Sequence, residues 1–225
     1  MGCVIIHKTP LEVLMRATRI SHKSEDRMDT IGDELGPNDE KLLEAIVKMG
    51  HHSVLEHVVY SIHVYDVSRA LLQQLARHRH TSLTVQSTRF TLKKVMRNLK
   101  DLETRSAVDR FCVVPPIDGE RLERFYESAY RSLMDLFEMI EDGVENDFSK
   151  YVLPECFKTE LILTTNAREL MHIIDLRLKE SAMWEFRRLV RDLLRSLFEV
   201  HPDLWKIIAS EMNWILEFQI SEFRR

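Results

Sequence analysis

The chain has 225 residues, 44% of them hydrophobic and 30% charged, and a net charge of −4. Its length allows one substantial core, or at most two small ones, and its composition is that of an ordinary soluble globular protein. The acidic balance argues against a general nucleic-acid or anionic-membrane binder, because binding through counterion release needs a wide basic surface.

Cysteine spacing and hydropathy narrow the setting further. Cys3, Cys112 and Cys156 form no Cys-x-x-Cys pair, so they predict neither a disulfide framework nor a zinc ribbon, and a reduced, cytoplasmic location is expected. No stretch has the apolar core of a signal peptide or the ~18 uninterrupted apolar residues of a membrane span. Few glycines and prolines leave little room for linkers, so we expect a single domain over residues 1–225.

The first part of the chain predicts short strands separated by helices. β-branched residues favour a strand over residues 4–7, and an apolar period of two favours another over residues 58–64. Residues 22–36 are polar and are expected to form a loop. Helices are expected to begin at Pro10, at a cap formed by Asn38 or Asp39, and at a cap formed by Ser68, with Gly50 closing the second.

The second part continues the same mixture. Strands are expected over residues 109–114, before a Pro-Pro step, and over residues 159–165. Helices are expected over residues 121–141, from Asn166 with Glu169 in a capping box, and over residues 183–200 and 204–223. Strands and helices do not alternate regularly, and no Gly-x-Gly-x-x-Gly is present. The fold class indicated is α/β (α+β), with a central mixed or antiparallel sheet flanked by helices and no Rossmann turn.

A basic cluster spans residues 77–89, which read RHRHTSLTVQSTR. A solvated basic turn after a helix is the plain interpretation, because cations are favoured at the C-terminal end of a helix. The mixture of bidentate forks and short hydroxyl donors nevertheless suits a phosphate better than a carboxylate. The residues that supply these groups are Arg77, Arg79, Arg89, Ser82, Thr84, Ser87 and Thr88.

Three short segments stand out by their order and spacing. Arg77-His78-Arg79 is followed, after seven residues, by Ser87. Upstream, residues 50–57 read GHHSVLEH. Downstream, Lys150 precedes a Leu-Pro step that leads to residues 166–177, NARELMHIIDLR. Taken together, the three segments resemble the flavin-dependent thymidylate synthases.

The resemblance implies a reaction and an assembly. The methylene group of methylenetetrahydrofolate is expected to be transferred to C5 of dUMP, while reduced FAD supplies the hydride and NADPH regenerates the reduced flavin. The expected assembly is a homotetramer whose active sites take residues from several subunits. This chemistry needs no thiolate, in agreement with the absence of cysteine from the three segments.

The resemblance also implies roles for individual residues. Arg177 is expected to be the catalytic residue, because a fixed guanidinium facing the uracil favours its N3-deprotonated form. The residues expected to contact FAD are Ser53 (from a neighbouring subunit), Arg77, His78, Arg79, Asn166, Arg168 and His172. Those expected to hold dUMP are Gln74, Arg77, Gln86, Ser87, Thr88, Arg89, Lys150 and Arg177, with Arg89 and Lys150 on the phosphate.

A few positions depart from the family's usual pattern. Thr84 and Val85 stand where many members carry Asn and Glu, and Phe90 stands where Tyr is frequent. Lys150 stands where Arg is common, so it offers a point charge in place of a bidentate fork.

Two other classes of function remain as alternatives to this enzyme. A flavin-free nucleotide- or RNA-binding module would use the same basic cluster, although the acidic net charge disfavours RNA as a partner. A metal-dependent hydrolase would use the histidines between His51 and His80. No His-Glu-x-x-His pattern accompanies them, so we expect no metal site.

Overall fold

The computed structural model describes residues 1–214, which divide into two compact units. Unit 1 consists of Met1 and residues 65–77 and 84–161, and unit 2 consists of residues 2–64, 78–83 and those from 162 onward. The expectation of a single domain over residues 1–225 stays a prediction. Within residues 1–214, no helix combines the length and the apolar character that a bilayer crossing needs.

One antiparallel sheet of four strands, in the order β1-β2-β4-β3, contributes residues to both units. The fold class is therefore the α/β (α+β) arrangement expected from the sequence, without a Rossmann turn. Strands at 4–7, 58–64 and 159–165 are confirmed, each one longer than or slightly displaced from its prediction. The bounds are Gly2–Lys8 for β1, Val59–Ser68 for β2, Thr81–Val85 for β3 and Lys158–Asn166 for β4.

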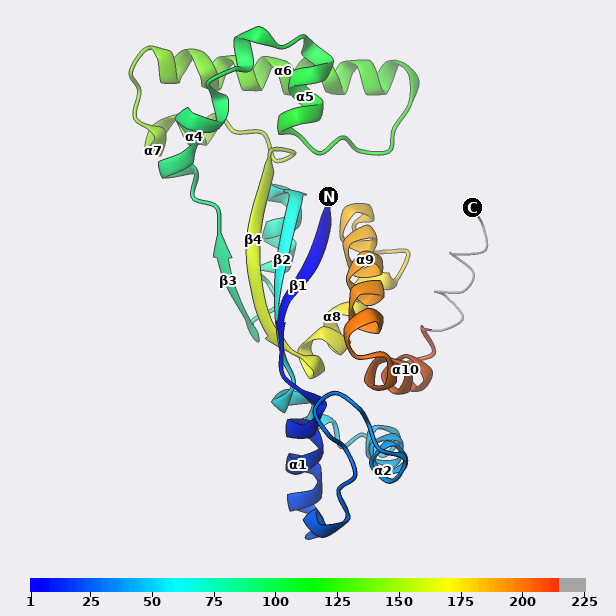
Figure 1. Ribbon diagram of the computed structural model, residues 1–225. Coiled ribbons are helices and arrows are strands. Elements are labelled where there is room, and N and C mark those ends of the chain that lie inside the picture. The colour runs from blue at the N-terminus through cyan, green and yellow to red at the C-terminus, as the bar shows by residue number, and fades with distance from the viewer. Residues whose placement is uncertain (215–225) are drawn as a thin grey trace. The chain divides into compact units, whose positions relative to one another are not determined.

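Unit 2 is built around β1 and the helices packed on it. Helix α9 (Trp184–Val200) runs beside β1, and α8 (Ala167–Leu178) packs against α9 (Figure 1). Leu189, Val190 and Leu193 on α9 are buried at helical spacing, as an amphipathic helix requires. The other helical segments of unit 2 are α1 (Leu11–Ser21), η1 (Glu25–Arg27), α2 (Pro37–Lys48), η2 (His52–His57) and α10 (Pro202–Glu211).

Two helix predictions in unit 2 need correction. The helix expected over 204–223 is interrupted: α10 ends at Glu211 and residues 212 and 213 form a turn, while residues 215–223 of that prediction lie outside the described residues. Neither Asn38 nor Asp39 caps α2, because Pro37 already occupies its first turn. The buried Asp39 carboxylate instead lies 2.6 Å from Arg19 Nη2 and accepts the backbone N–H of Thr30 at 2.9 Å. It therefore holds the expected polar loop against α1.

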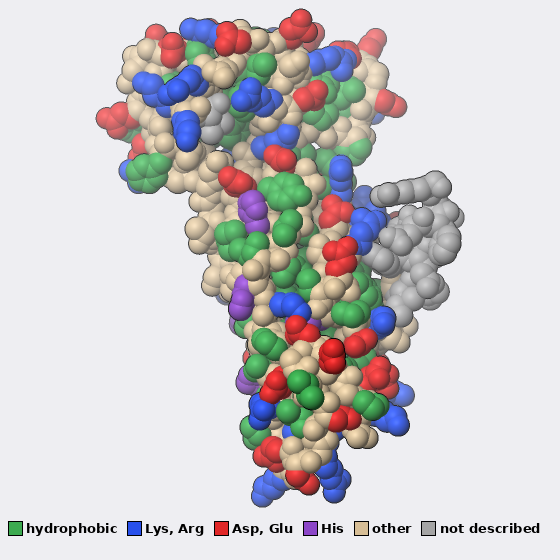
Figure 2. Space-filling view, in the orientation of Figure 1, with side chains coloured by type: hydrophobic (Ala, Val, Ile, Leu, Met, Phe, Trp, Pro, Cys, Tyr) green, Lys and Arg blue, Asp and Glu red, His purple; other side chains and the backbone are tan. Residues whose placement is uncertain are grey.

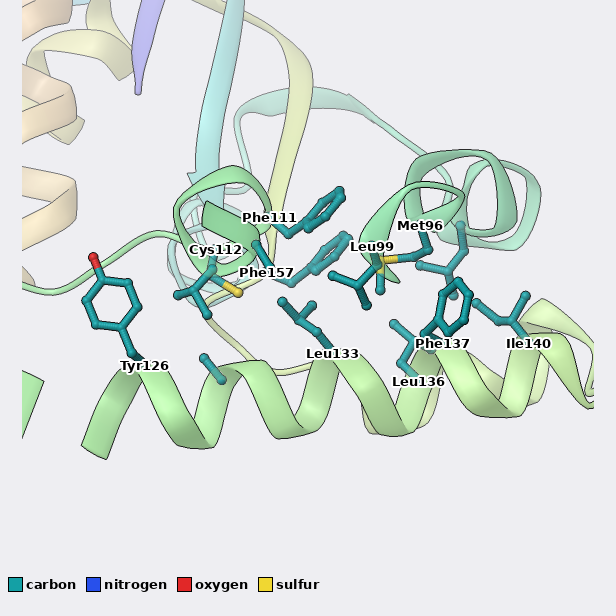
Figure 3. Close-up of a cluster of buried hydrophobic side chains, with 14 residues drawn as sticks. Met96, Leu99, Phe111, Cys112, Tyr126, Leu133, Leu136, Phe137, Ile140 and Phe157 are labelled. Carbon is teal, nitrogen blue, oxygen red and sulfur yellow. The ribbon is translucent and has the colours of Figure 1, made fainter. Parts of the chain in front are cut away.

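Unit 1 is mainly helical, and its core is one cluster packed against one side of the long helix α6 (Gly119–Glu141) (Figure 3). Leu133, Leu136, Phe137 and Ile140 recur at helical spacing along the buried side of α6 and face the rest of this cluster. The prediction over 121–141 is thus confirmed. The remaining helical segments are α3 (Arg69–Leu75), α4 (Thr88–Met96), η3 (Leu99–Asp101), α5 (Thr104–Phe111), α7 (Asn146–Ser149) and η4 (Lys150–Val152).

The predicted strand over 109–114 is wrong. Its first residues end helix α5, and only Cys112 forms a bridge, to Phe157. Ala107, Val108 and Phe111 are buried at helical spacing, and this periodicity outweighs the β-branched pair that precedes the prolines. The Ser68 cap, in contrast, is confirmed: its Oγ accepts the backbone N–H of Leu71 at 3.0 Å.

A buried polar network ties the two ends of unit 2 together. Trp205 Nε1 can only donate, and it lies 3.0 Å from the Tyr60 hydroxyl oxygen. The Tyr60 hydroxyl therefore donates to His201 Nδ1 at 2.7 Å, which leaves the proton of the neutral imidazole on Nε2, 2.9 Å from Asp33 Oδ1. Lys8 pairs with the other oxygen of Asp33. Each polar group in this series of contacts, from Trp205 to Lys8, thus has a partner.

We predict that Tyr60→Phe lowers the free energy of unfolding by about 1–3 kcal/mol, because Trp205 Nε1 and His201 Nδ1 would both lose a buried partner. Chemical denaturation followed by circular dichroism would measure the change. Tyr130→Phe is the matched control, because within residues 1–214 its hydroxyl has no hydrogen bond and its ring is only partly buried. Equal stability of the two variants would contradict the role of the network.

His201 also predicts a dependence of stability on pH. Burial lowers the pKa of His201 below its ordinary 6.5, and the charge of Lys8 acts in the same direction while Asp33 opposes it. The unfolded chain therefore binds a proton that the folded chain does not, and stability falls as pH drops below 6.5, by at most ~1.4 kcal/mol per pH unit for this one group. The free energy of unfolding, measured from pH 7.5 to 5.5, should fall less steeply with decreasing pH in His201→Gln than in the unaltered protein. An equal dependence on pH in the two proteins would contradict this role of His201.

Candidate active site

The residues singled out in the sequence fall into both units. Those expected on the flavin lie mostly in unit 2, where Ser53 is exposed on η2, Arg79 is exposed in the turn before β3, and Asn166, Arg168, His172 and Arg177 follow one another from the end of β4 along α8. Those expected on the nucleotide lie mostly in unit 1, on α3, α4 and η4. His80, to which the sequence assigned no functional role, also belongs to unit 2.

In unit 2, the turn from β4 into α8 is fixed by a helix cap. Asn166 Oδ1 accepts the backbone N–H of Glu169 at 2.9 Å, so the predicted capping residue is confirmed. The side-chain amide nitrogen of Asn166 remains available as a hydrogen-bond donor. Arg168, one turn before His172, is exposed and pairs with Glu56 of η2. The cap thus places a neutral donor, a guanidinium and an imidazole along the start of one helix.

These side chains border a hollow of about 540 Å³ in unit 2. A hollow of this size with several donors at its rim is suited to a bound organic ligand. Sequence reasoning missed some of its lining, although residues 50–57 already placed His52 and Glu56 next to Ser53. The lining residues are His52, Glu56, His80, Asn166, Arg168, Glu169, Met171 and His172.

His78 does not lie open to the hollow but is buried, with 6% of its surface exposed. Its Nε2 is 3.2 Å from Arg177 Nη2 and 3.3 Å from Arg177 Nε, and its Nδ1 is 3.4 Å from Glu169 Oε1. Burial lowers the pKa of His78, and the positive charge of Arg177 lowers it further, against the opposing effect of Glu169. The imidazole is therefore neutral near pH 7 and links α8 to the segment before β3.

Arg177 is half-buried and held on two sides. Its guanidinium carbon lies 4.8 Å from the centre of the Phe186 ring, on the first turn of α9, and its Nε and Nη2 face His78. A guanidinium stacked on an aromatic ring keeps its charge and its planar fork. The residue predicted to be catalytic is thus positioned by neighbours from two other segments of unit 2, the start of α9 and the segment before β3.

In unit 1, the start of α4 offers backbone donors. Ser87 is its N-cap residue, and the Ser87 carbonyl accepts the backbone N–H of Thr91 at 3.1 Å. The backbone N–H groups of Thr88 and Arg89 precede the first bonds of the helix and point out of its N-terminal end, a direction that favours an anion. Three of the residues expected to hold dUMP, Ser87, Thr88 and Arg89, therefore share one helix end.

A carboxylate bridges the two cations expected on that phosphate. One oxygen of Asp147, on α7, lies 3.2 Å from Arg89 Nε and 2.5 Å from Lys150 Nζ. The hydrogen bond from Lys150 lowers the pKa of Asp147, and the charge of Arg89 adds to this effect. Asn146 Nδ2 also donates to the Arg89 carbonyl at 2.9 Å. Sequence reasoning had not singled out Asp147, which brings Arg89 and Lys150 together.

The other nucleotide residues are placed less distinctively. Gln74 is half-buried on α3, Arg77 is exposed just after it, and the backbone N–H of Gln86 donates to the Glu160 carbonyl at 2.9 Å. Within residues 1–214, Arg77 and Arg79 form no ion pair, in contrast to Arg89 and Arg168. Acidic and basic side chains are interspersed over the face shown in Figure 2.

No group of three or more His, Cys, Asp or Glu side chains in the described part of the chain is arranged to hold a metal ion. Two of the histidines between 51 and 80 make contacts with other segments instead. His52 Nε2 lies 3.1 Å from the Val47 carbonyl, and the His80 carbonyl accepts a hydrogen bond from Thr165 Oγ1 at 2.8 Å.

Comparison with known proteins places these features in a family. The family described as thymidylate synthase complementing protein matches residues 4–203. A flavin-dependent thymidylate synthase of Campylobacter jejuni is 37% identical over 213 residues, covering 92% of this chain and 95% of its own length. The corresponding enzyme of Wolinella succinogenes is 35% identical over 208 residues, covering 91% and 97%.

Solved structures agree with this assignment. A crystal structure of thymidylate synthase X from Helicobacter pylori with FAD and dUMP superimposes with a TM-score of 0.81 at 29% identity, covering 92% of this chain and 98% of that one. Sequence family, relatives and fold therefore agree over nearly the same residues. The chain belongs to the flavin-dependent thymidylate synthases.

Proposed function

We propose that this protein converts dUMP to dTMP by reductive methylation, with FAD as the redox cofactor, methylenetetrahydrofolate as the carbon donor and NADPH as the reductant. The observation that carries the proposal is the match over 92% of the chain to a thymidylate synthase solved with FAD and dUMP. The reduced flavin, when bound, would supply the hydride. The protein's own residues bind and orient the reactants.

The groups around the hollow of unit 2 suit the flavin. The Asn166 amide can donate to the ring oxygens and nitrogens, and the unpaired Arg79 and the exposed Arg168 offer charge to the diphosphate. His172 is exposed in the lining of the same hollow, and Ser53, exposed on η2, would complete the contacts from a neighbouring subunit. The side chain of His78 is buried, so we assign it to the support of Arg177, and only its backbone is left for a flavin contact.

The start of α4 suits the phosphate of dUMP. Backbone N–H groups at a helix end and two cations are the usual elements of a phosphate site. Ser87, Thr88, Arg89 and Lys150 supply them, and Gln74, Arg77 and Gln86 are assigned to the rest of the nucleotide. Since Lys150 replaces an Arg, orientation of the phosphate would depend on the Arg89 fork and the backbone.

Arg177 would act on the uracil ring. Negative charge develops on the ring when N3 is deprotonated, which makes C5 nucleophilic toward the methylene carbon, and a guanidinium already held in place stabilises that charge without reorganisation. Its contacts with Phe186 and His78 provide this rigidity. A cytoplasmic homotetramer with active sites shared between subunits belongs to the same proposal.

The first test is dTMP formation from dUMP with methylenetetrahydrofolate and NADPH, with and without added FAD. Product that requires FAD supports the proposal. NADPH oxidation stimulated by dUMP without dTMP would mean that a flavin site works while methyl transfer is lost. If neither activity is found, the basic cluster would be assigned to anion binding without a flavin, the alternative that the family assignment disfavours.

We predict that Arg89→Ala raises the KM for dUMP by about tenfold to a hundredfold, because a charge-assisted bond to the phosphate is lost. Asp147→Asn should lower that KM a few-fold, because the competing carboxylate loses its charge. Arg97→Ala, an exposed cation at the other end of α4, is the control. Steady-state kinetics would decide, and an unchanged KM in Arg89→Ala would show that the phosphate binds elsewhere.

We predict that Arg177→Ala reduces dTMP formation by about a hundredfold or more, the loss typical of removing one preorganised charge-stabilising group. Binding of FAD, followed by its absorbance spectrum, should be largely kept. Arg188→Ala changes an exposed cation on α9 and should leave both quantities unaltered. Normal turnover of Arg177→Ala would exclude the catalytic assignment.

A further inference from the structure

The imidazole of His78 is enclosed by charged and aromatic groups of unit 2. Arg177 lies at its Nε2 and Glu169 at its Nδ1. The rings of His172 and Phe186 each meet it edge to face, with centroids 6.0 Å away. Since His78 and Glu169 are both buried, water does not compete strongly for these contacts.

The partners determine which nitrogen of His78 carries the proton. A guanidinium has donors only, so Nε2 must accept from Arg177. The proton of the neutral ring then resides on Nδ1, directed at the Glu169 carboxylate. The opposite tautomer would set two donors against each other at Nε2 and leave the buried carboxylate without its partner.

Glu169 reaches His78 through the geometry of the helix start. Its backbone N–H is engaged by Asn166 Oδ1, which fixes the residue in the first turn of α8. A capping box would turn the Glu169 side chain back toward the Asn166 backbone, but here its carboxylate lies against His78. The carboxylate therefore does more than stabilise the helix.

We propose that Glu169 is a positioning residue that holds His78 in the Nδ1-protonated tautomer, so that Nε2 can accept from Arg177 and keep the guanidinium in its working orientation. The inference rests on the proposed function only for the role of Arg177. The arrangement of Glu169, His78 and Arg177 can be tested without any turnover.

Protonation of His78 would break this arrangement, because Nε2 would then become a donor facing a cation. The groups that face the ring are Arg177, Glu169 and His172, and burial holds the pKa of His78 below 6.5. Turnover should therefore fall on the acidic side of that value. Since the Glu169 charge opposes the lowering, its removal should move the acidic limb of the pH profile to lower pH.

The first measurement is NMR of the purified holoenzyme labelled with [15N]histidine, at pH 7.5, with His78→Gln identifying the His78 signals. Protonated Nδ1 and unprotonated Nε2 are expected. The reverse tautomer or a doubly protonated ring overturns the proposal, whether or not dTMP is formed. This readout separates failure of the inference from failure of the proposed function.

Kinetics of three variants complete the test. Glu169→Met removes the acceptor at similar size and should lower kcat about tenfold, with little change in the KM for dUMP. Glu169→Gln keeps an oxygen acceptor without the charge; it should recover most of kcat while shifting the acidic limb. Glu180→Gln, exposed beyond the end of α8, should behave as the unaltered enzyme. An unchanged kcat in Glu169→Met would overturn the proposal. So would an acidic limb that stays, in both Glu169 variants, at the pH found for the unaltered enzyme.

Discussion

The hydrogen bond from the Glu169 backbone to Asn166 Oδ1 sets the geometry on which unit 2's candidate site depends. It fixes the residue at which β4 stops and α8 begins, and the helical period then determines where every later side chain points. Arg168 and His172, four residues apart, face the hollow together. Glu169 and Arg177, eight residues apart, face His78 together. A displaced cap would turn both pairs at once, so one polar side chain at a strand end controls two separate faces of the helix.

Much of this could be anticipated from the sequence where periodicity was strong. The alternation around Tyr60 and the long stripe ending at Ile140 each identified an element and its buried side. Periodicity failed where two patterns overlapped, as at Phe111, where helical spacing runs into β-branched residues before two prolines. It also gave no warning of β3, which lies at the sheet edge, where half-buried and exposed residues alternate but none is fully buried.

The candidate site was foreseen as a set of residues and not as a set of contacts. Local motifs named His78 and Arg177, but burial of the His78 ring follows from packing against α8 and α9, which are distant in sequence. In the same way, Asp147 became visible only when folding brought its carboxylate to Arg89. Such carboxylates explain how locally basic segments occur in an acidic protein, because Arg89 and Arg168 are already paired with Asp147 and Glu56. An anionic ligand must displace these carboxylates, so its binding free energy is smaller than its charge alone suggests.

The network of Tyr60, His201 and Trp205 has a consequence for the order of folding. It joins residues that precede and follow, in the sequence, the larger continuous segment of unit 1, residues 84–161. During synthesis from the N-terminus, residues 84–161 leave the ribosome as a complete stretch, whereas residues 2–64 wait for the last helices before Tyr60 finds its partners. Closure over so long a separation is entropically costly and slow. The earliest part of the chain to be made is thus among the last to become fully buried, and its apolar strands are exposed in the interval.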